Sequence, residues 1–390
     1  MQFAYICRKK SDMKKKSNPF LLKGYQSKEF FCDRQKEVDQ LYANVTNGID
    51  TTLISARKMG KTGLILRFFD HLKEQGDTKY LYVDIFSSRN LSEFIKLLAE
   101  AILFAFPEPT PIGKQFMDFI KGFRPMIGYD PLTGQPQIQI SYHSAQEKEY
   151  TLQGLFGFLE NQGERIVVAI DEFQQISEYP EKNTEELLRT YTQNLSNIRF
   201  IFCGSRKAMM IHLFSNVKRP FYASTQYLSL EKIDPEVYSL FIRDKFSEAG
   251  IGITDDSLTM VLSWSLLHTY YTQSLCNMLY YMVDNQITID TVKRACVEIL
   301  KRNEPVFYQY RQLLTSAQWN FLIAIAKEGE VKQLTAQKFI AKYEIGTPAN
   351  ARRISRSLVE KELLLELSNK KETTYRVYDV FLSRWLESEY

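Results

Sequence analysis

The sequence predicts an α/β protein, in which a parallel β-sheet with helices on both faces precedes two smaller regions. Three observations support this prediction. Short apolar runs alternate with longer segments of helical periodicity up to about residue 225. Residues 231–305 contain no strand pattern, and residues 306–390 show helical periodicity followed by a hairpin pattern. We therefore divide the 390-residue chain into a tail at 1–16, a sheet domain at 17–230, a helical domain at 231–305 and a C-terminal domain at 306–390.

The charge of the chain is concentrated in the tail. The net charge is +4, of which residues 1–16 contribute +5, so the remaining residues sum to −1. The folded part is therefore not basic, and its charge does not indicate nucleic-acid binding. The tail is either a solvated arm or a functional basic arm. Met1 and Met13 are both candidate start residues.

Composition predicts a cytoplasmic protein without a membrane partner. The five cysteines have no paired spacing, which indicates reduced thiols in place of a disulfide framework or a zinc site. The four histidines are scattered and match no zinc spacing. No apolar run approaches the ~18 residues of a membrane span.

The strands of the sheet domain are continuous apolar runs, as expected where both faces of a parallel sheet are buried. Five runs follow this pattern: 51–54, 80–85, 166–170, 198–203 and 227–230. One stretch, at about 107–145, interrupts their alternation with helices. There we expect a helix at 113–122 and an exposed hairpin around the turn residues 130–134. This insertion is either a decoration of the domain or an element that contacts a partner or substrate.

The strongest motif follows the first strand. It comprises Ser55, Ala56, Arg57, Lys58, Met59, Gly60, Lys61, Thr62 and Gly63, and a helical pattern follows it directly. Strand, loop and helix are the context that a phosphate-binding loop needs, because backbone N–H groups and the helix N-terminus cradle phosphate oxygens. We expect Lys61 to contact the β- and γ-phosphates of ATP, and the Thr62 hydroxyl to bind Mg²⁺. Ser55 stands where the pattern usually has its first glycine.

Two further strand ends supply the rest of the predicted site. The run 166–170 leads into Asp171 and Glu172, which predicts an indirect Mg²⁺ ligand and a base that polarises the attacking water. The alternative is that both acids cap the next helix. The run 198–203 leads to Ser205, either a γ-phosphate contact or a plain turn serine.

Together these motifs resemble the AAA+-related P-loop ATPases of the archaeal-ATPase and STAND-like group, over about residues 18–305. The segment Phe30–Leu41 resembles that group's Phe-x-x-Arg-x-x-Glu-x-x-x-Leu element. The resemblance implies that Arg34 lies near the adenine and that residues 231–305 form a lid. The usual Gly-Arg pair before the fifth strand is missing; Arg206 and Arg219 are the nearest candidates for an arginine that completes a neighbouring subunit's site.

The C-terminal domain has the pattern of a winged helix: three helices and a hairpin. Thr315 or Ser316, Thr335, and Thr347 with Pro348 are the expected helix starts. The third helix carries Arg352, Arg353 and Arg356, and the hairpin turn carries Lys370 and Lys371. This arrangement fits DNA docking, although winged helices also serve as protein-interaction modules.

The sequence therefore predicts an ATP-binding, ATP-hydrolysing regulatory protein whose nucleotide state controls the lid and the winged helix. The cofactors are ATP and Mg²⁺, and the expected partners are DNA and further copies of the chain. The alternative is a nucleotide-gated binding module, with DNA as its candidate partner, that does not turn ATP over.

Overall fold

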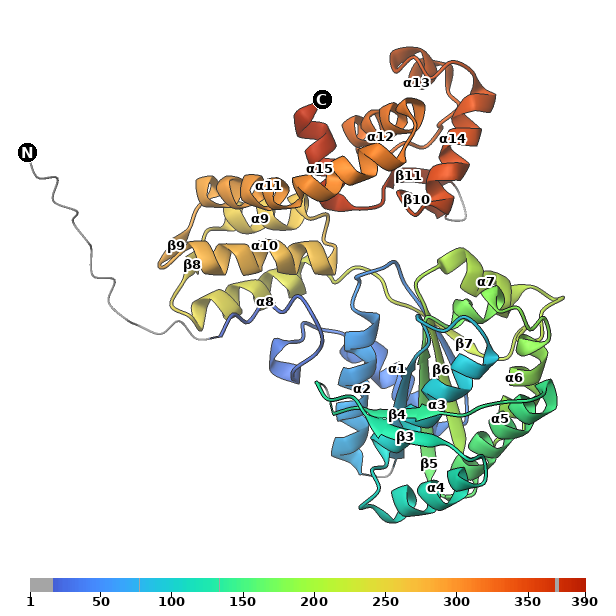
Figure 1. The fold of residues 1–390 in the computed structure, drawn as a ribbon. Helices are drawn as coiled ribbons and strands as arrows, with labels where there is room; N and C mark the ends of the chain where they lie inside the picture. The colour runs from blue at the N-terminus through green and yellow to red at the C-terminus, as the bar shows by residue number, and fades with distance from the viewer. Residues whose placement is uncertain (1–16, 77, 133, 369–371) are drawn as a thin grey trace, which may run out of the picture. The chain divides into compact units, whose positions relative to one another are not determined.

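The computed structural model describes residues 17–390 apart from 77, 133 and 369–371. It divides into two compact units, a sheet unit at Lys23–Ile233 and a helical unit that joins residues 17–22 to Asp234–Tyr390 (Figure 1). The predicted tail at 1–16 lies outside the described residues. None of the helices in the described ranges is both long enough and apolar enough to cross a bilayer.

A five-stranded parallel sheet forms the centre of the sheet unit, which confirms the predicted fold class. Its strand order is β2-β5-β6-β1-β7. The strands are β1 (Thr51–Ile54), β2 (Thr78–Asp84), β5 (Arg165–Asp171), β6 (Ile198–Gly204) and β7 (Gln226–Ser229). All four neighbouring pairs are parallel, so every strand ends at the same edge of the sheet. The residues that follow the strands are thereby collected at one edge.

Both faces of the sheet are buried, as the continuous apolar runs predicted. Along β5, Val168 faces one hydrophobic cluster and Val167 the other, because successive side chains of a strand point to opposite faces. One face is covered by α1 (Gln35–Thr46) and α2 (Lys61–Gln75). The other is covered by α3 (Leu91–Ala105), α5 (Ala145–Glu160), η2 (Phe173–Glu178), α6 (Thr184–Thr192) and α7 (Lys207–Ser215). A short 3₁₀ helix, η1 (Lys28–Phe30), precedes α1.

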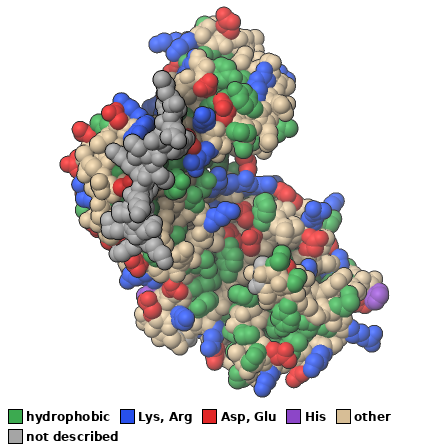
Figure 2. All heavy atoms as spheres, turned by 60° about the vertical axis from the view of Figure 1, so that its left-hand side comes forward, with side chains coloured by type: hydrophobic (Ala, Val, Ile, Leu, Met, Phe, Trp, Pro, Cys, Tyr) green, Lys and Arg blue, Asp and Glu red, His purple; other side chains and the backbone are tan. Residues whose placement is uncertain are grey.

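The insertion consists of α4 (Pro111–Lys121) and an antiparallel hairpin of β3 (Met126–Tyr129) and β4 (Pro136–Gln139). The hairpin is only partly exposed, unlike the expectation. Ile138 is 1% exposed and packs into the cluster around α3, and its backbone N–H donates to Glu100 Oε1 at 2.8 Å. Met126 and Tyr129 remain exposed. On the face drawn in Figure 2, hydrophobic side chains gather on the sheet unit, and charges of both signs are interspersed.

The helical unit begins with α8 (Pro235–Ser247), α9 (Asp255–Trp264), α10 (Thr269–Met282) and α11 (Ile289–Leu313). Two short strands that the sequence analysis did not expect, β8 (Gly252–Ile253) and β9 (Gln286–Ile287), pair in parallel. Residues 17–22, assigned to the sheet domain from the sequence, pack here instead. The rings of Phe20 and Phe246 have centroids 4.7 Å apart.

The C-terminal domain is a winged helix, as predicted, and α11 runs across the expected boundary between 305 and 306. Its further elements are α12 (Ser316–Glu328), α13 (Gln337–Lys342), α14 (Pro348–Glu360), β10 (Leu364–Ser368), β11 (Thr373–Val377) and α15 (Val380–Glu389). Thr315 and Thr347 cap their helices as predicted. The prediction for Thr335 was wrong, because α13 starts later and Ala336 precedes it. The final helix, α15, was not predicted.

Candidate functional site

The loop between β1 and α2 turns through two residues in the left-handed region, Lys58 at φ 61° and Gly60 at φ 98°. Gly60 precedes the first helical residue and supplies no side-chain cap. The first backbone N–H groups of α2 can therefore donate hydrogen bonds to a group outside the helix. Such an N-terminus favours an anion, above all a phosphate.

The side chains of the loop are arranged around this helix start. Lys61 is the first residue of α2, and only 7% of it is exposed. Ser55, in place of the usual glycine, is also buried, and its hydroxyl donates to the Ala56 carbonyl at 2.9 Å. The serine therefore satisfies its hydroxyl within its own loop. Of the other loop residues, Met59 is buried, Ala56, Arg57 and Gly63 are half-buried, and Lys58 is exposed.

Asp171 joins the loop to the end of β5. Its Oδ2 accepts hydrogen bonds from the Thr62 hydroxyl at 3.0 Å and the Tyr82 hydroxyl at 2.6 Å, and its Oδ1 accepts from the Glu172 backbone N–H at 2.9 Å. Burial and the neighbouring carboxylate of Asp171 raise the pKa of Tyr82, so this phenol stays a proton donor. Both oxygens of the carboxylate are thus held in place.

Glu172 and Ser205 also come together. The Ser205 hydroxyl donates to Glu172 Oε2 at 2.8 Å, and the Gln174 side-chain amide donates to the same oxygen. Glu172 has a φ of 56°, a conformation that non-glycine residues adopt rarely. Strained backbone of this kind clusters at functional sites. The structure therefore brings three sequence-predicted residues, Asp171, Glu172 and Ser205, to one edge of the sheet.

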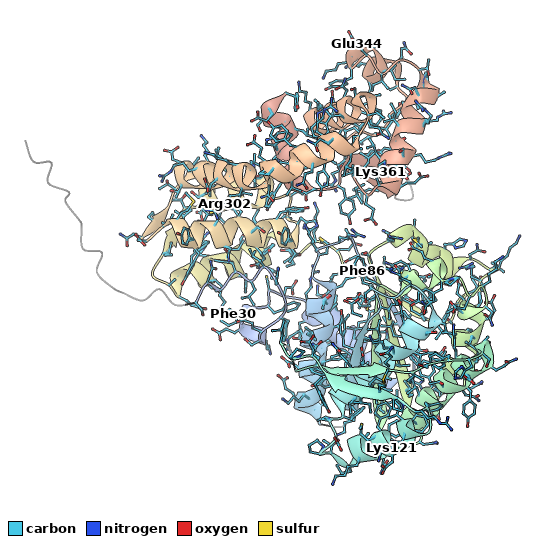
Figure 3. All side chains as sticks on the ribbon, in the orientation of Figure 1. Phe30, Phe86, Lys121, Arg302, Glu344 and Lys361 are labelled. Carbon is cyan, nitrogen blue, oxygen red and sulfur yellow. The ribbon has the colours of Figure 1, made fainter. Side chains whose placement is uncertain are left out.

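The carboxyl edge of β2 and β5 is strongly acidic. Asp84 lies opposite Asp171 in the strand register. Burial raises the pKa of Asp84, and the negative charges of Asp171 and Glu172 raise it further. The hydrogen bond that Asp84 accepts from the Phe86 N–H lowers it in part. Phe86 marks this edge in Figure 3. A site of this charge favours a cation.

The residues present fit a magnesium ion. Within the described part of the chain, no three histidine, cysteine or acidic side chains are grouped as a metal cage would need. Mg²⁺ bound to a nucleotide does not require one, because phosphates and water fill most of its positions. Thr62 and Asp171, an oxygen donor and a carboxylate already in contact, would hold it.

Arg34 connects two segments of the sheet unit through hydrogen bonds. It is 4% exposed, has a left-handed φ of 72°, and donates to Glu37 at 2.9 Å and to the Glu231 carbonyl at 2.6 Å. It thereby ties the start of α1 to the residues after β7. Phe31, three residues before Arg34, lies near the start of α2, since a Cβ added at Gly63 would lie 3.0 Å from its ring.

Sequence reasoning missed Tyr82, Gln174 and Phe31. Tyr82 is two residues before the end of β2, but only the strand order shows that β2 lies beside β5. Gln174 lies two residues after the acidic pair, and its place so close to those acids was the available signal. Phe31 lies inside the segment that was singled out for Arg34.

Both candidate arginines are ion-paired within their own unit. Arg206 bonds to Glu178, and Arg219 bonds to Glu185. Arg219 is partly buried and Glu185 is 7% exposed.

The three arginines of the winged helix lie on the exposed side of α14. With Ala349, Ser357 and Glu360 they line a hollow of about 440 Å³. Arg353 donates to Asn350 at 3.0 Å, whereas the Arg352 and Arg356 side chains have no partner among the described residues. Lys370 and Lys371 lie outside the described residues.

Comparison with known proteins places both domains. A family model described as an ATPase domain predominantly from Archaea matches residues 31–266, and one described as a probable winged helix domain matches residues 305–388. No curated protein sequence matches the chain.

Solved structures agree in fold. The Walker-type ATPase of Pyrococcus abyssi is 19% identical with a TM-score of 0.64, covering 94% of this chain and 99% of that one. The ORC2 protein of Aeropyrum pernix, in ADPNP–ADP complexes, is 15% identical with a TM-score of 0.50, covering 96% and 98%. Because the ATPase model covers more than half of the chain, the protein belongs to this family of P-loop ATPase domains found predominantly in Archaea, and a winged-helix domain follows its ATPase domain.

Proposed function

We propose that the protein binds ATP with Mg²⁺ and hydrolyses it. The observation that carries this proposal is the contact between the Thr62 hydroxyl and Asp171, with Glu172 next in the chain. An accidental strand–helix turn would not require this contact. Lys61 and the N–H groups at the start of α2 bind the phosphates, and Thr62 and Asp171 hold the metal.

Glu172 is the proposed base, which accepts a proton from the attacking water. The bound metal would neutralise charge that develops on the phosphate oxygens. Ser205 holds Glu172 Oε2 and leaves Oε1 without a bond from any described residue. A carboxylate held by one oxygen keeps a fixed position and a free lone pair, as a general base needs.

Nucleotide state is proposed to act on the winged helix through the helical domain. Inside the helical unit these two parts are firmly joined. The helix α11 runs from one into the other, Arg384 Nε donates to the Trp264 carbonyl at 3.1 Å, and the rings of Phe381 and Tyr271 have centroids 4.7 Å apart. We expect the unit to move as one body when nucleotide binds.

The test is to measure ATP binding and phosphate release on the same protein. Binding of a fluorescent ATP analogue that is lost in Lys61→Ala supports the phosphate site. Phosphate release that requires Mg²⁺ and is lost in Glu172→Gln supports hydrolysis. Tight ATP binding without phosphate release would rule out the enzyme and favour the alternative, a nucleotide-gated binding module that does not hydrolyse ATP.

A second activity, binding of duplex DNA, is favoured by the exposed face of α14. Two of its three arginines have no side-chain partner among the described residues, and they flank a hollow. Phosphate groups satisfy such guanidinium donors well. The salt dependence of binding, argued at the element scale below, tests this activity.

A further inference from the structure

Gln174 is a buried polar residue that follows Asp171 and Glu172 closely in the chain. It lies in η2 and is 3% exposed, between the buried side chains of Phe173 and Ile176. Its Nε2 donates to Glu172 Oε2. A carboxylate only accepts hydrogen bonds, so this contact fixes which end of the amide faces Glu172.

The other end of the amide is unsatisfied. The Gln174 Oε1 atom is buried and accepts no hydrogen bond from any described residue. It lies against Gly204, where an added Cβ would be only 2.3 Å from it and 2.5 Å from the Met210 side chain. The glutamine can occupy this place only because residue 204 has no side chain.

Such an arrangement does not favour stability. A buried acceptor without a partner destabilises the folded state, and an apolar side chain of the same length would avoid that cost. The benefit of a glutamine at this position must therefore come from the other end of the amide, which donates to Glu172. Ser205 donates to the same Glu172 oxygen at 2.8 Å, so two donors converge on Oε2 and neither touches Oε1.

We propose that Gln174 is a positioning residue for hydrolysis: with Gly204 behind it, it holds Glu172 so that Oε1 meets the attacking water. The proposal rests on the proposed hydrolysis by Glu172. It assigns to Gln174 no contact with nucleotide or metal. Loss of the amide should therefore slow the chemical step without weakening nucleotide binding.

The first variant is Gln174→Met, which keeps the length of the side chain and removes its polar atoms. We expect kcat to fall about 10- to 100-fold, the range for a misplaced catalytic group. KM and the affinity for a fluorescent ATP analogue should not change, and the thermal midpoint should stay equal or rise. The matched control is Gln175→Met, because Gln175 is the adjacent glutamine and its side-chain amide donates to Glu178 at 3.2 Å, away from the Glu172 carboxylate.

The second variant, Gly204→Ala, leaves the glutamine intact and displaces it. It should reproduce the loss of kcat. A double-mutant cycle then separates positioning from general damage. In single-turnover assays with labelled ATP, Gln174→Met should have no further effect in a Glu172→Gln background, because the group that it positions is already gone.

Each other outcome overturns the proposal. Unchanged kcat in Gln174→Met removes the role of Gln174 and leaves hydrolysis intact. An equal loss in the Glu172→Gln background, accompanied by a lower thermal midpoint, assigns Gln174 to structure alone. A parent protein that binds ATP but releases no phosphate overturns both this proposal and the hydrolysis on which it rests.

Discussion

Lys61 and Glu172 act at different stages of the proposed reaction, and single substitutions should separate them. Lys61→Ala removes a charge from the bound ground state, so it should weaken ATP binding and abolish turnover. Glu172→Gln should lower kcat by about 10²–10⁴ and leave ATP affinity nearly intact. Equilibrium titration of an ATP analogue and phosphate release on each variant measure this. Glu172→Gln turning over as fast as the parent would show that another group is the base.

Tyr82 should affect the metal requirement. Its hydroxyl is 2.6 Å from Asp171 Oδ2 and holds the carboxylate beside Thr62. In Tyr82→Phe the carboxylate loses one of its two Oδ2 donors and can rotate. We expect the Mg²⁺ concentration for half-maximal turnover to rise severalfold, while binding of the ATP analogue without Mg²⁺ is unchanged. A lower requirement would mean that the phenol competes with the metal. Tyr80→Phe, on the same strand, is the control.

At the scale of elements, a half-buried acid, Asp50, directly precedes β1. Burial raises the pKa of Asp50 to about 6, although the Phe200 N–H, which donates to Asp50 Oδ1 at 2.8 Å, and Arg199 oppose the shift. The folded state therefore favours the protonated acid. The stability that protonated Asp50 contributes is complete below the unfolded-state pKa of 3.8 and is lost as the pH rises through about 6.

Replacement of this acid by its amide should remove that loss. Asp50→Asn keeps an acceptor for the Phe200 N–H and cannot ionise. We expect it to raise the free energy of unfolding at pH 7 by about 3 kcal/mol and to have little effect at pH 4. Urea unfolding at both pH values measures the difference. An equal effect at the two pH values would mean that ionisation of Asp50 is not its cause.

The helix α14 should bind duplex DNA without sequence preference. Three to five neutralised phosphates give a slope of log affinity against log salt of roughly −3 to −4. In fluorescence anisotropy, the triple variant Arg352→Ala, Arg353→Ala, Arg356→Ala should lose most of the affinity. The variant Lys293→Ala, Arg294→Ala, Arg302→Ala removes the same charge from exposed positions of α11 and should keep it. Absence of binding at ~50 mM salt would leave a protein partner as the role of the winged helix.

At the scale of the whole molecule, efficient hydrolysis should require assembly with further copies. Arg206 and Arg219, the two candidates for an arginine that completes a neighbour's site, are each paired with an acid of their own sheet unit. An arginine supplied by a neighbour contributes about 10³–10⁵ in rate. Turnover per chain should therefore rise with protein concentration. Mixing Glu172→Gln with Arg206→Ala should restore activity that neither has alone. A monomer with constant specific activity over a wide dilution series would contradict this.

Much of the fold and part of the site follow from local pattern. A strand buried on both faces must be apolar throughout, so the five strands were visible in the chain. The phosphate loop and the Asp171–Glu172 pair were visible for a related reason: parallel strands end at one edge, and polar residues directly after them meet there. The caps at Thr315 and Thr347 are set within a few residues of sequence. These features depend on neighbours along the chain.

Tertiary structure alone decided which distant residues share a contact. Tyr82 reaches Asp171 because β2 lies beside β5, and Gln174 fits beside Glu172 because Gly204 ends the next strand. Residues 17–22 join the helical unit because Phe20 packs on Phe246, more than two hundred positions away. The sequence by itself determined the elements and the chemical groups at their ends, since both depend on local periodicity. Strand order and long-range packing determined which of those groups meet, because burial of apolar surface does not depend on separation along the chain.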